Sequence, residues 1–252
     1  MMLALSVHPS RRGDLETPDW VRTQPAIDVG QYIDGFGNIC SRILAPAGRT
    51  VLSSDFVIRD SGQPDEYAPQ APQIDVSQLP DETLVFLLGS RYCETDQLSE
   101  TAWSLFGGAP TGWGRVQAIV DYVHEHIQFG YEHARRTRGA LEAWTERRGV
   151  CRDYAHLAIT FCRCMNIPAR YCTGYLGDIG VPVVGEMDFS AWFEAYLGGR
   201  WYAFEARNHP PRIGRVLIAR GRDAVDVAIT NAFGQANLVE FKIVSVDLPV
   251  AA

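Results

Sequence analysis

Several features are scarce in this 252-residue chain, and each absence argues against a class of protein. No apolar stretch approaches the roughly 20 residues that span a bilayer, so we expect no membrane-spanning segment and no membrane partner. The formal net charge is −7, and without a basic surplus nucleic acid is not an expected partner. The apolar start, Met1 to Val7, is short and follows no basic segment, which does not fit a signal peptide. The sequence therefore predicts a soluble cytoplasmic protein.

Metal-binding and disulfide patterns are also lacking. There is no C-x-x-C pair, and His124 and His126 stand two apart on a predicted helix, so they do not share a face. A chain of this length with no expected signal peptide needs no disulfides to stay folded. We therefore expect no metal and no cofactor, and free buried thiols apart from Cys151. The six cysteines are Cys40, Cys93, Cys151, Cys162, Cys164 and Cys172.

The composition divides the chain at residues 60–80, a stretch rich in proline, glutamine, aspartate and serine that is typical of an exposed linker. Residues 1–70 contain strand-like runs and turn clusters, so we expect a β-rich N-terminal region. Residues 80–252 are expected to form the main domain. Hydrophobic residues make up 46% of the chain, enough to build a substantial core.

Apolar periodicity predicts the main elements of this domain. Trp113 to Ile127 carries apolar residues at helical spacing. A long helix is expected from Cys151 to Asn166, ended by Pro168. Two glycines, Gly198-Gly199, mark the turn of a hairpin. The expected strands are residues 169–175, 188–197, 200–206 and 238–246. Helices followed by antiparallel strands predict an α+β fold.

The segment Gly149-Val150-Cys151 puts a cysteine at the start of the predicted long helix. The free N–H groups and the positive dipole end of a helix stabilise a thiolate, which is the nucleophilic form of cysteine. The same N–H groups can bind the oxyanion of an acyl-transfer intermediate. From local context alone, a small buried hydrophobic residue at a helix cap is an equally good interpretation.

The wider context resembles a known family. Residues 149–157 read GVCRDYAHL, residues 166–171 read NIPARY, and the hairpin reads AWFEAY at 191–196 and WYAFE at 201–205. Together these segments resemble the core motif of the bacterial transglutaminase-like superfamily, over roughly residues 80–218. Residues 1–70 resemble the β-rich N-terminal region that many bacterial members carry. The resemblance implies a papain-like core, in which Cys151 lies on a central helix packed on an antiparallel sheet.

The resemblance also implies a chemistry. In this family the cysteine attacks an acyl group, commonly a glutamine side-chain amide or a peptide bond. A histidine activates the cysteine and an aspartate orients the histidine. Members include cross-linking enzymes, proteases and amidases, so the implied substrate is a peptide or protein with an amide group. A protease or amidase is expected more than a cross-linker. A calcium requirement belongs mainly to the animal enzymes, and no acidic loop here demands one.

This sequence departs from the family pattern at two positions. The histidine position holds Ser190 and the aspartate position holds Glu205. With a turn at the two glycines, Tyr196 pairs with Trp201, and Ser190 then lies diagonally to Glu205 on one face of the sheet. Serine cannot act as a general base near neutral pH, and a glutamate is a weak base for a thiol.

Three interpretations follow. The protein is an inactive relative that binds a peptide in the cleft without turnover, or another histidine supplies the base, or the thiolate forms through the helix dipole and Arg152 alone. The better candidate for the base is His209, which lies four residues after Glu205. His156 is the weaker candidate, because it lies five residues after Cys151 on the same helix and points to a different side of it. With neither, the thiol would be reactive but turnover poor, because no acid protonates the leaving amine.

Two further groups have more ordinary interpretations. Tyr131 and Trp144 precede Cys151, where family members often place an aromatic oxyanion donor, and the sequence does not choose between them. Residues 212–222 carry four arginines among apolar residues, a pattern that indicates a solvated edge.

The leading hypothesis is a thiol enzyme that performs acyl transfer or hydrolysis through Cys151. The alternative is a non-catalytic peptide- or protein-binding relative.

Overall fold

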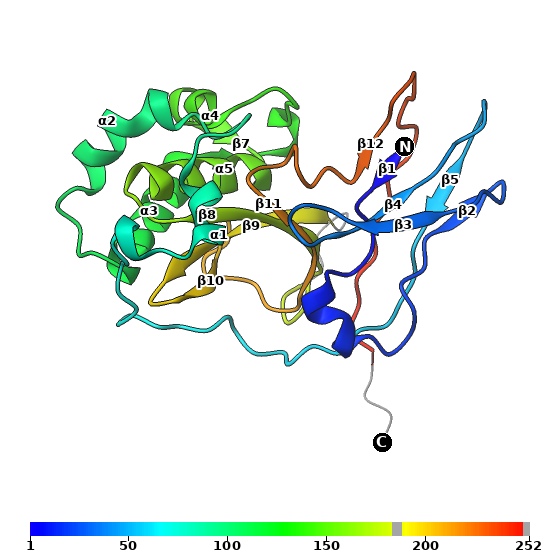
Figure 1. The fold of residues 1–252 in the computed structure, drawn as a ribbon, viewed down its shortest axis with the longest axis horizontal. Coiled ribbons are helices and arrows are strands. Elements are labelled where there is room, and N and C mark those ends of the chain that lie inside the picture. The colour runs from blue at the N-terminus through cyan, green and yellow to red at the C-terminus, as the bar shows by residue number, and fades with distance from the viewer. Residues whose placement is uncertain (183–187, 249–252) are drawn as a thin grey trace.

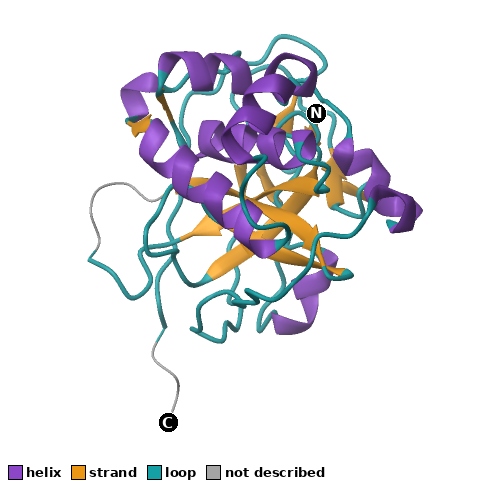
Figure 2. Cartoon of the chain, turned by 90° about the vertical axis from the view of Figure 1, so that its left-hand side faces the viewer, coloured by secondary structure: helices purple, strands orange, loops and turns teal. Residues whose placement is uncertain are grey.

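The computed structural model describes residues 1–182 and 188–248 of the chain. Helices gather on one side of a central antiparallel sheet, and the N-terminal strands lie on the opposite side of the molecule (Figure 1). Seen from the helical side, the helices form a layer over the sheet (Figure 2). This arrangement of helices and antiparallel strands confirms the predicted α+β fold.

The helix α5, Cys151–Cys164, is the centre of the helical layer. All of its residues except Arg152 are buried, because it packs against the sheet on one side and other helices on the other. Its partners among the helices are α2, α3 and α4. The other helices are α1 (Asp81–Leu84), α2 (Thr95–Phe106), α3 (Trp113–His126) and α4 (Ala140–Glu146), with short 3₁₀ turns at Pro9–Asp14, Val76–Gln78, Val85–Leu87 and Tyr131–His133.

The core sheet has the strand order β10-β9-β8-β11, with antiparallel neighbours throughout. Its α5 face contributes Ala191, Phe193 and Ala195 to the main hydrophobic core. Trp192 packs on the opposite face with Cys172 and Leu217. The strands are β8 (Ala169–Leu176), β9 (Asp188–Leu197), β10 (Arg200–Phe204) and β11 (Arg215–Gly221).

The N-terminal region forms a second sheet, in the order β12-β1-β4-β3. Its strand β12 comes from the far end of the chain and pairs with β1 (Figure 1). The region attaches along β11, since the His8 N–H donates to the Leu217 carbonyl and the Asn38 amide donates to the Arg220 carbonyl. The remaining strands are β1 (Met2–Leu3), β2 (Arg22–Gln24), β3 (Gly30–Ile33), β4 (Ile39–Arg42), β5 (Val51–Ser53), β6 (Gln128–Phe129), β7 (Arg148–Gly149) and β12 (Thr230–Asn231).

The predicted helices and hairpin are confirmed. The helix expected from Trp113 is α3, and the one expected from Cys151 is α5. Strands β9 and β10 form the hairpin across the two glycines, and Tyr196 pairs with Trp201 as predicted. All six cysteines are free and buried, which confirms the prediction made for the five other than Cys151. Within the described residues, no helix is both long enough and apolar enough to cross a bilayer.

Two predictions were wrong. Residues 238–246 form no strand, because this segment has no partner strand and several of its apolar side chains, such as Val239, are exposed. Residues 212–222 are not a solvated edge. Most of them form the edge strand β11, and each of the four arginines pairs with a carboxylate. The pairs are Arg212–Asp178, Arg215–Glu205, Arg220–Glu194 and Arg222–Asp226.

The division at residues 60–80 stays a prediction. Residues 61–64 are exposed and form no helix or strand. The chain just after them is tied to the core, because Asp65 pairs with Arg215 and Glu66 pairs with Arg200. The segment then runs past the core sheet to reach α1 (Figure 1).

Candidate active site

Cys151 is the first residue of α5, directly after the N-cap residue Val150. Its exposed fraction is 7%, so the sulfur lies in a largely dry environment at the helix start. The first N–H groups of a helix have no carbonyl partner within the helix, and they carry the positive end of its dipole. A thiol at this place meets groups that stabilise its anion.

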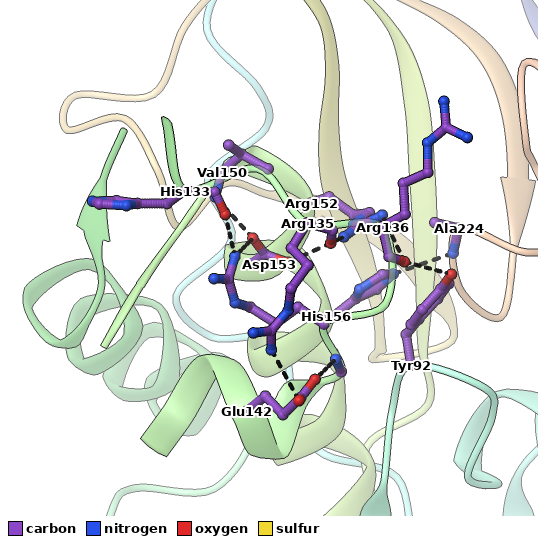
Figure 3. A network of polar contacts seen from close by, with 12 residues as sticks. Tyr92, His133, Arg135, Arg136, Glu142, Val150, Arg152, Asp153, His156 and Ala224 are labelled. Atoms are coloured by element: carbon purple, nitrogen blue, oxygen red, sulfur yellow. Dashed lines mark hydrogen bonds and ion pairs between the residues drawn. The ribbon is translucent and has the colours of Figure 1, made fainter. Parts of the chain in front are cut away.

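A buried ion pair holds the start of α5 in place (Figure 3). Asp153 Oδ2 accepts hydrogen bonds from the Val150 N–H at 2.9 Å and from Arg138 Nη1 at 3.1 Å. Both side chains are buried, and Arg138 also pairs with Glu146. Burial raises the pKa of Asp153, while the Val150 N–H and the two neighbouring arginines act against that rise. The network fixes the backbone on both sides of Cys151.

Gly149 is required by the same network. A Cβ atom at this position would meet Asp153 Oδ2 at 2.5 Å, closer than real Cβ contacts. The glycine therefore lets the carboxylate fold back over the chain to reach the Val150 N–H.

Ser190 lies on β9 directly opposite Gly174 of β8. It is 2% exposed, and its hydroxyl has no hydrogen-bond partner among the residues that the structure describes. Side chains alternate along a strand, so Ser190 shares the sheet face of Trp192, whereas Ala191 packs towards α5. A glycine opposite leaves this position without a cross-strand side chain.

Glu205 follows the last residue of β10, and its carboxylate is held by three donors. Oε2 accepts from Arg215 Nη2 at 2.5 Å and from the Arg212 N–H at 3.2 Å, and Oε1 accepts from the Asn208 amide. The Arg215 guanidinium lies 5.8 Å from the Trp192 ring, which puts Glu205 beside the face that Trp192 occupies. Burial raises the pKa of Glu205 and lowers that of Arg215 to about 10.

This geometry agrees with comparisons with known proteins. The family model described as the transglutaminase-like superfamily matches residues 100–206. The uncharacterized protein ML0607 of Mycobacterium leprae is 39% identical over 235 residues, covering 82% of this chain and 77% of that protein. The chain belongs to the transglutaminase-like superfamily. A solved structure of a candidate cysteine protease from Cytophaga hutchinsonii is similar over 93% of this chain and 80% of its own, with 30% identity and a TM-score of 0.77.

The matched transglutaminase-like core contains Cys151, Ser190 and Glu205. It begins inside α2 and ends just after β10, so the helical layer, β8 and the hairpin form its framework. The predicted family and fold are both confirmed. The roles of the three residues stay predictions.

His209 makes its described contacts with α3. Its ring stacks on His124, with 4.3 Å between the ring centroids, and Nε2 lies 4.0 Å from Asp121 Oδ1. His124 Nδ1 is in turn 3.1 Å from the Ala206 carbonyl. These contacts tie the loop after β10 to the surface of the helical layer.

His156 is a core residue of α5. It is fully buried, its ring stacks on Tyr92 at 5.1 Å, and Nε2 accepts a hydrogen bond from the Ala224 N–H at 3.2 Å. Burial lowers its pKa well below the usual value, so the ring is neutral. With Nε2 as acceptor, Nδ1 carries the proton. These contacts give His156 a packing role, as expected for the weaker base candidate.

The two aromatic candidates for an oxyanion donor differ in their contacts. The indole N–H of Trp144 donates to the Tyr122 hydroxyl at 3.2 Å, so it is already engaged. Tyr131 is 54% exposed and stacks edge-on against Phe129. The Arg207 guanidinium also lies 5.9 Å from the Tyr131 ring centroid, so the choice between the two aromatic residues stays open.

Sequence reasoning missed Tyr171 and Arg138. Tyr171, on β8, is buried, and the Cys151 thiol is among the groups that raise its pKa, burial being the main cause. Its phenol therefore stays protonated at neutral pH. Nothing in the local sequence marks Arg138, but an acidic residue two positions after Cys151 is a helix-start signal that would have found Asp153.

Within the described residues no group of three histidine, cysteine or acidic side chains is arranged to hold a metal.

Proposed function

We propose that this protein is a thiol acyl-transfer enzyme that acts on the amide of a peptide or protein through Cys151. The observation that carries the proposal is a cysteine fixed as the first residue of a 14-residue buried helix, behind a backbone held by Asp153 and Arg138. A thiolate is stabilised in such a place, and it is a strong nucleophile for carbonyl carbon.

The chemistry follows from the groups at the helix start. The Cys151 sulfur attacks the carbonyl carbon, and the oxyanion is bound by N–H groups of the helix start. The carbon–nitrogen bond then breaks, the amine leaves with a proton, and a thioester remains. Water or a second amine attacks the thioester and regenerates the thiolate. Because position 190 holds a serine, the proton for the leaving amine comes from water, which makes turnover slow.

A second function, binding a peptide without turnover, is favoured by the state of Glu205. Its carboxylate is held by Arg215, Asn208 and the Arg212 backbone, so it serves the structure of the loop after β10. A carboxylate that would orient a histidine has no catalytic use where no histidine is present. Ser190 and Glu205 together therefore fit a cleft that binds a peptide but no longer catalyses a reaction.

Trapping of the thioester separates the two functions. The protein would be incubated with a small glutamine-containing acyl donor and analysed by peptide mass mapping. We expect an acyl adduct on Cys151 that forms faster than it is released to an added amine. The Cys151→Ala variant should form no adduct. The control variant Cys40→Ala, which removes another buried thiol, should behave as wild type. A wild-type protein without any adduct on Cys151 would favour the binding function.

A further inference from the structure

Guanidinium groups gather around Tyr92, next to the start of α5. The Arg91 guanidinium lies 4.9 Å and the Arg152 guanidinium 5.3 Å from the Tyr92 ring centroid. The Tyr92 hydroxyl donates to the Arg136 carbonyl at 2.8 Å, and Arg152 also donates to that carbonyl. We call Tyr92, Arg91, Arg136 and Arg152 the Tyr92 cluster.

The arginines near this site fall into two kinds. Arg135 pairs with Glu142 and Glu146 at 2.9 Å each, and Arg138 is buried against Glu146 and Asp153, so both are neutralised. By contrast, Arg91 and Arg136 are exposed and pair with no carboxylate in the part of the chain that the structure describes. The Arg136 side chain extends away from the network while its carbonyl faces inwards (Figure 3).

The two acidic groups that contact residues of the cluster are already engaged. Asp153, the carboxylate nearest Arg152 at 3.6 Å, is fully buried and also binds Arg138. Asp223 is buried as well, and its two oxygens accept the backbone N–H groups of Tyr92 and Val225. A local surplus of positive charge therefore remains, on a chain whose formal net charge is −7.

We propose that the Tyr92 cluster binds a carboxylate of an acidic peptide whose acyl group is presented to Cys151. The inference rests on the proposed function and adds the substrate class. Arg152 is the next residue after Cys151, so the cluster begins within one residue of the nucleophile. An extended peptide advances about 3.3 Å per residue, and a carboxylate a few residues from the reacting amide would reach the guanidinium groups.

The form of the cluster favours a carboxylate over a nucleic acid. The two guanidinium groups beside the Tyr92 ring, those of Arg91 and Arg152, match a carboxylate, which accepts paired N–H donors from arginine, and the exposed Arg136 adds positive charge nearby. Nucleic acid binding needs an extended basic surface that neutralises many phosphates, and the acidic balance of this chain argues against it. The carboxylate comes from an aspartate or glutamate side chain or from a free C-terminus.

Peptide binding to the full-length Cys151→Ala variant tests the proposal without turnover. Three fluorescent peptides of equal length would be compared by anisotropy. One carries glutamates and an amidated end, one has glutamines in their place, and one is neutral with a free C-terminal carboxylate. We expect at least one carboxylate peptide to bind more tightly than the amidated neutral peptide, and the tighter of the two identifies the source. The preference should shrink in 1 M salt, where the Debye length falls to about 3 Å.

Arginine variants then assign the preference to the cluster. The Arg91→Gln, Arg136→Gln double variant should lose roughly three- to tenfold in affinity for the preferred peptide. Neither side chain forms a described ion pair, so the fold should be kept. The matched control is Arg42→Gln combined with Arg22→Gln, which removes the same charge from exposed positions without a described ion pair in the N-terminal region and should change nothing.

Several outcomes would overturn the proposal: equal or absent binding of the three peptides, an equal loss in the control variant, or tighter binding of an oligonucleotide than of any peptide. Acylation of Cys151 by the small neutral donor is measured separately. A missing adduct counts against the proposed function, whereas a missing charge preference counts only against the Tyr92 cluster.

Discussion

Burial alone does not distinguish Cys151 from the other cysteines. Its exposed fraction of 7% is close to the 9% of Cys40 and the 8% of Cys164. The difference lies in the surroundings of each sulfur. Burial raises the pKa of Cys40, Cys93 and Cys164 to about 11, and it raises those of Cys162 and Cys172 as well. Of the six, Cys151 alone begins a helix.

Cys151 should therefore be the first thiol to react with limiting iodoacetamide. A helix start stabilises the thiolate, while raised pKa values keep the other five thiols protonated at pH 7.5. Peptide mapping after partial labelling measures the order of reaction. First labelling at Cys40 or Cys164, which are about equally accessible, would show that the helix start does not activate Cys151.

Replacing Ser190 by histidine should raise acyl transfer. An imidazole with a pKa near 6.5 can accept and return a proton at neutral pH, and such help contributes about 10²–10⁴-fold. Gly174 opposite has no side chain, but the Val216 carbonyl fills the space above it, and position 190 lies on the Trp192 face and not on the face that packs on α5, so the new ring has little room. Because Glu205 is already held by Arg215, the new ring would be oriented imperfectly, and the gain should fall near the lower limit.

The rate with a glutamine peptide and an amine acceptor should be compared across wild type, Ser190→His and His209→Ala, with circular dichroism to verify folding. A gain in Ser190→His with no change in His209→Ala supports a degenerate enzyme. Wild-type activity that disappears in His209→Ala would instead identify His209 as the base.

At the level of residues, sequence reasoning found what local motifs carry. Cys151 and the hairpin partners were predictable because short segments of fixed spacing determine them. The Tyr92 cluster was not, since Tyr92 and Arg136 are 44 positions apart and meet only through tertiary packing. The engagement of Glu205 by Arg215 was also hidden, because the sequence does not reveal that β11 lies beside this face.

Among the elements, α5 depends on the buried pair at its start. Asp153→Ala should destabilise the protein by about 3–5 kcal/mol. The substitution removes a buried carboxylate that pairs with Arg138, and it leaves the Val150 N–H without its acceptor. Urea unfolding measures the change. Asp96→Ala, in the first turn of α2 but exposed, should cost well under about 1 kcal/mol. Equal losses in both variants would contradict a special role for the pair.

The elements that sequence reasoning missed are those without a clear period. Helices α3 and α5 and the β9–β10 hairpin were predicted from apolar spacing and a two-glycine turn. Strand β11 was missed because its arginines mask the apolar residues between them, and their charges are paired only after folding. Residues 238–246 alternate as a strand would, but alternation cannot supply a partner strand.

At the scale of the molecule, stability should fall on acidification. Burial, with Arg220 and Arg170 nearby, lowers the pKa of His8 from 6.5 to about 4, and Glu194 and Asp34 act weakly in the opposite direction. Burial also lowers the pKa of His156. Below pH 6.5 the unfolded chain binds these protons and the folded protein does not, so the stabilisation present above pH 6.5 is lost as the pH falls towards 4.

Each of the two histidines should account for roughly 1 kcal/mol of the free energy of unfolding lost between pH 7 and pH 5.5. Urea titrations at several pH values measure this loss. The His8→Gln variant should show a shallower pH dependence than wild type. An unchanged slope would mean that His8 is protonated in the folded protein.

The linker prediction can be tested on the intact chain. Brief treatment with a protease of broad specificity should cut first within residues 61–64, which are exposed and lack hydrogen-bonded structure. The two fragments should remain together on size-exclusion chromatography, because the β1–β12 pairing and the contacts along β11 hold them. First cleavage elsewhere would contradict an exposed linker.

The pairing of β1 with β12 has a consequence for synthesis. Strand β1 is made before the core domain, yet one of its two neighbours emerges from the ribosome only after the entire core domain has been translated. At about 5–20 residues per second, this edge of the N-terminal sheet waits for ten seconds or more with its backbone N–H and carbonyl groups unpaired. During that interval the nascent chain presents an open strand edge, so chaperone binding to the N-terminal region should be strongest before Thr230 and Asn231 appear.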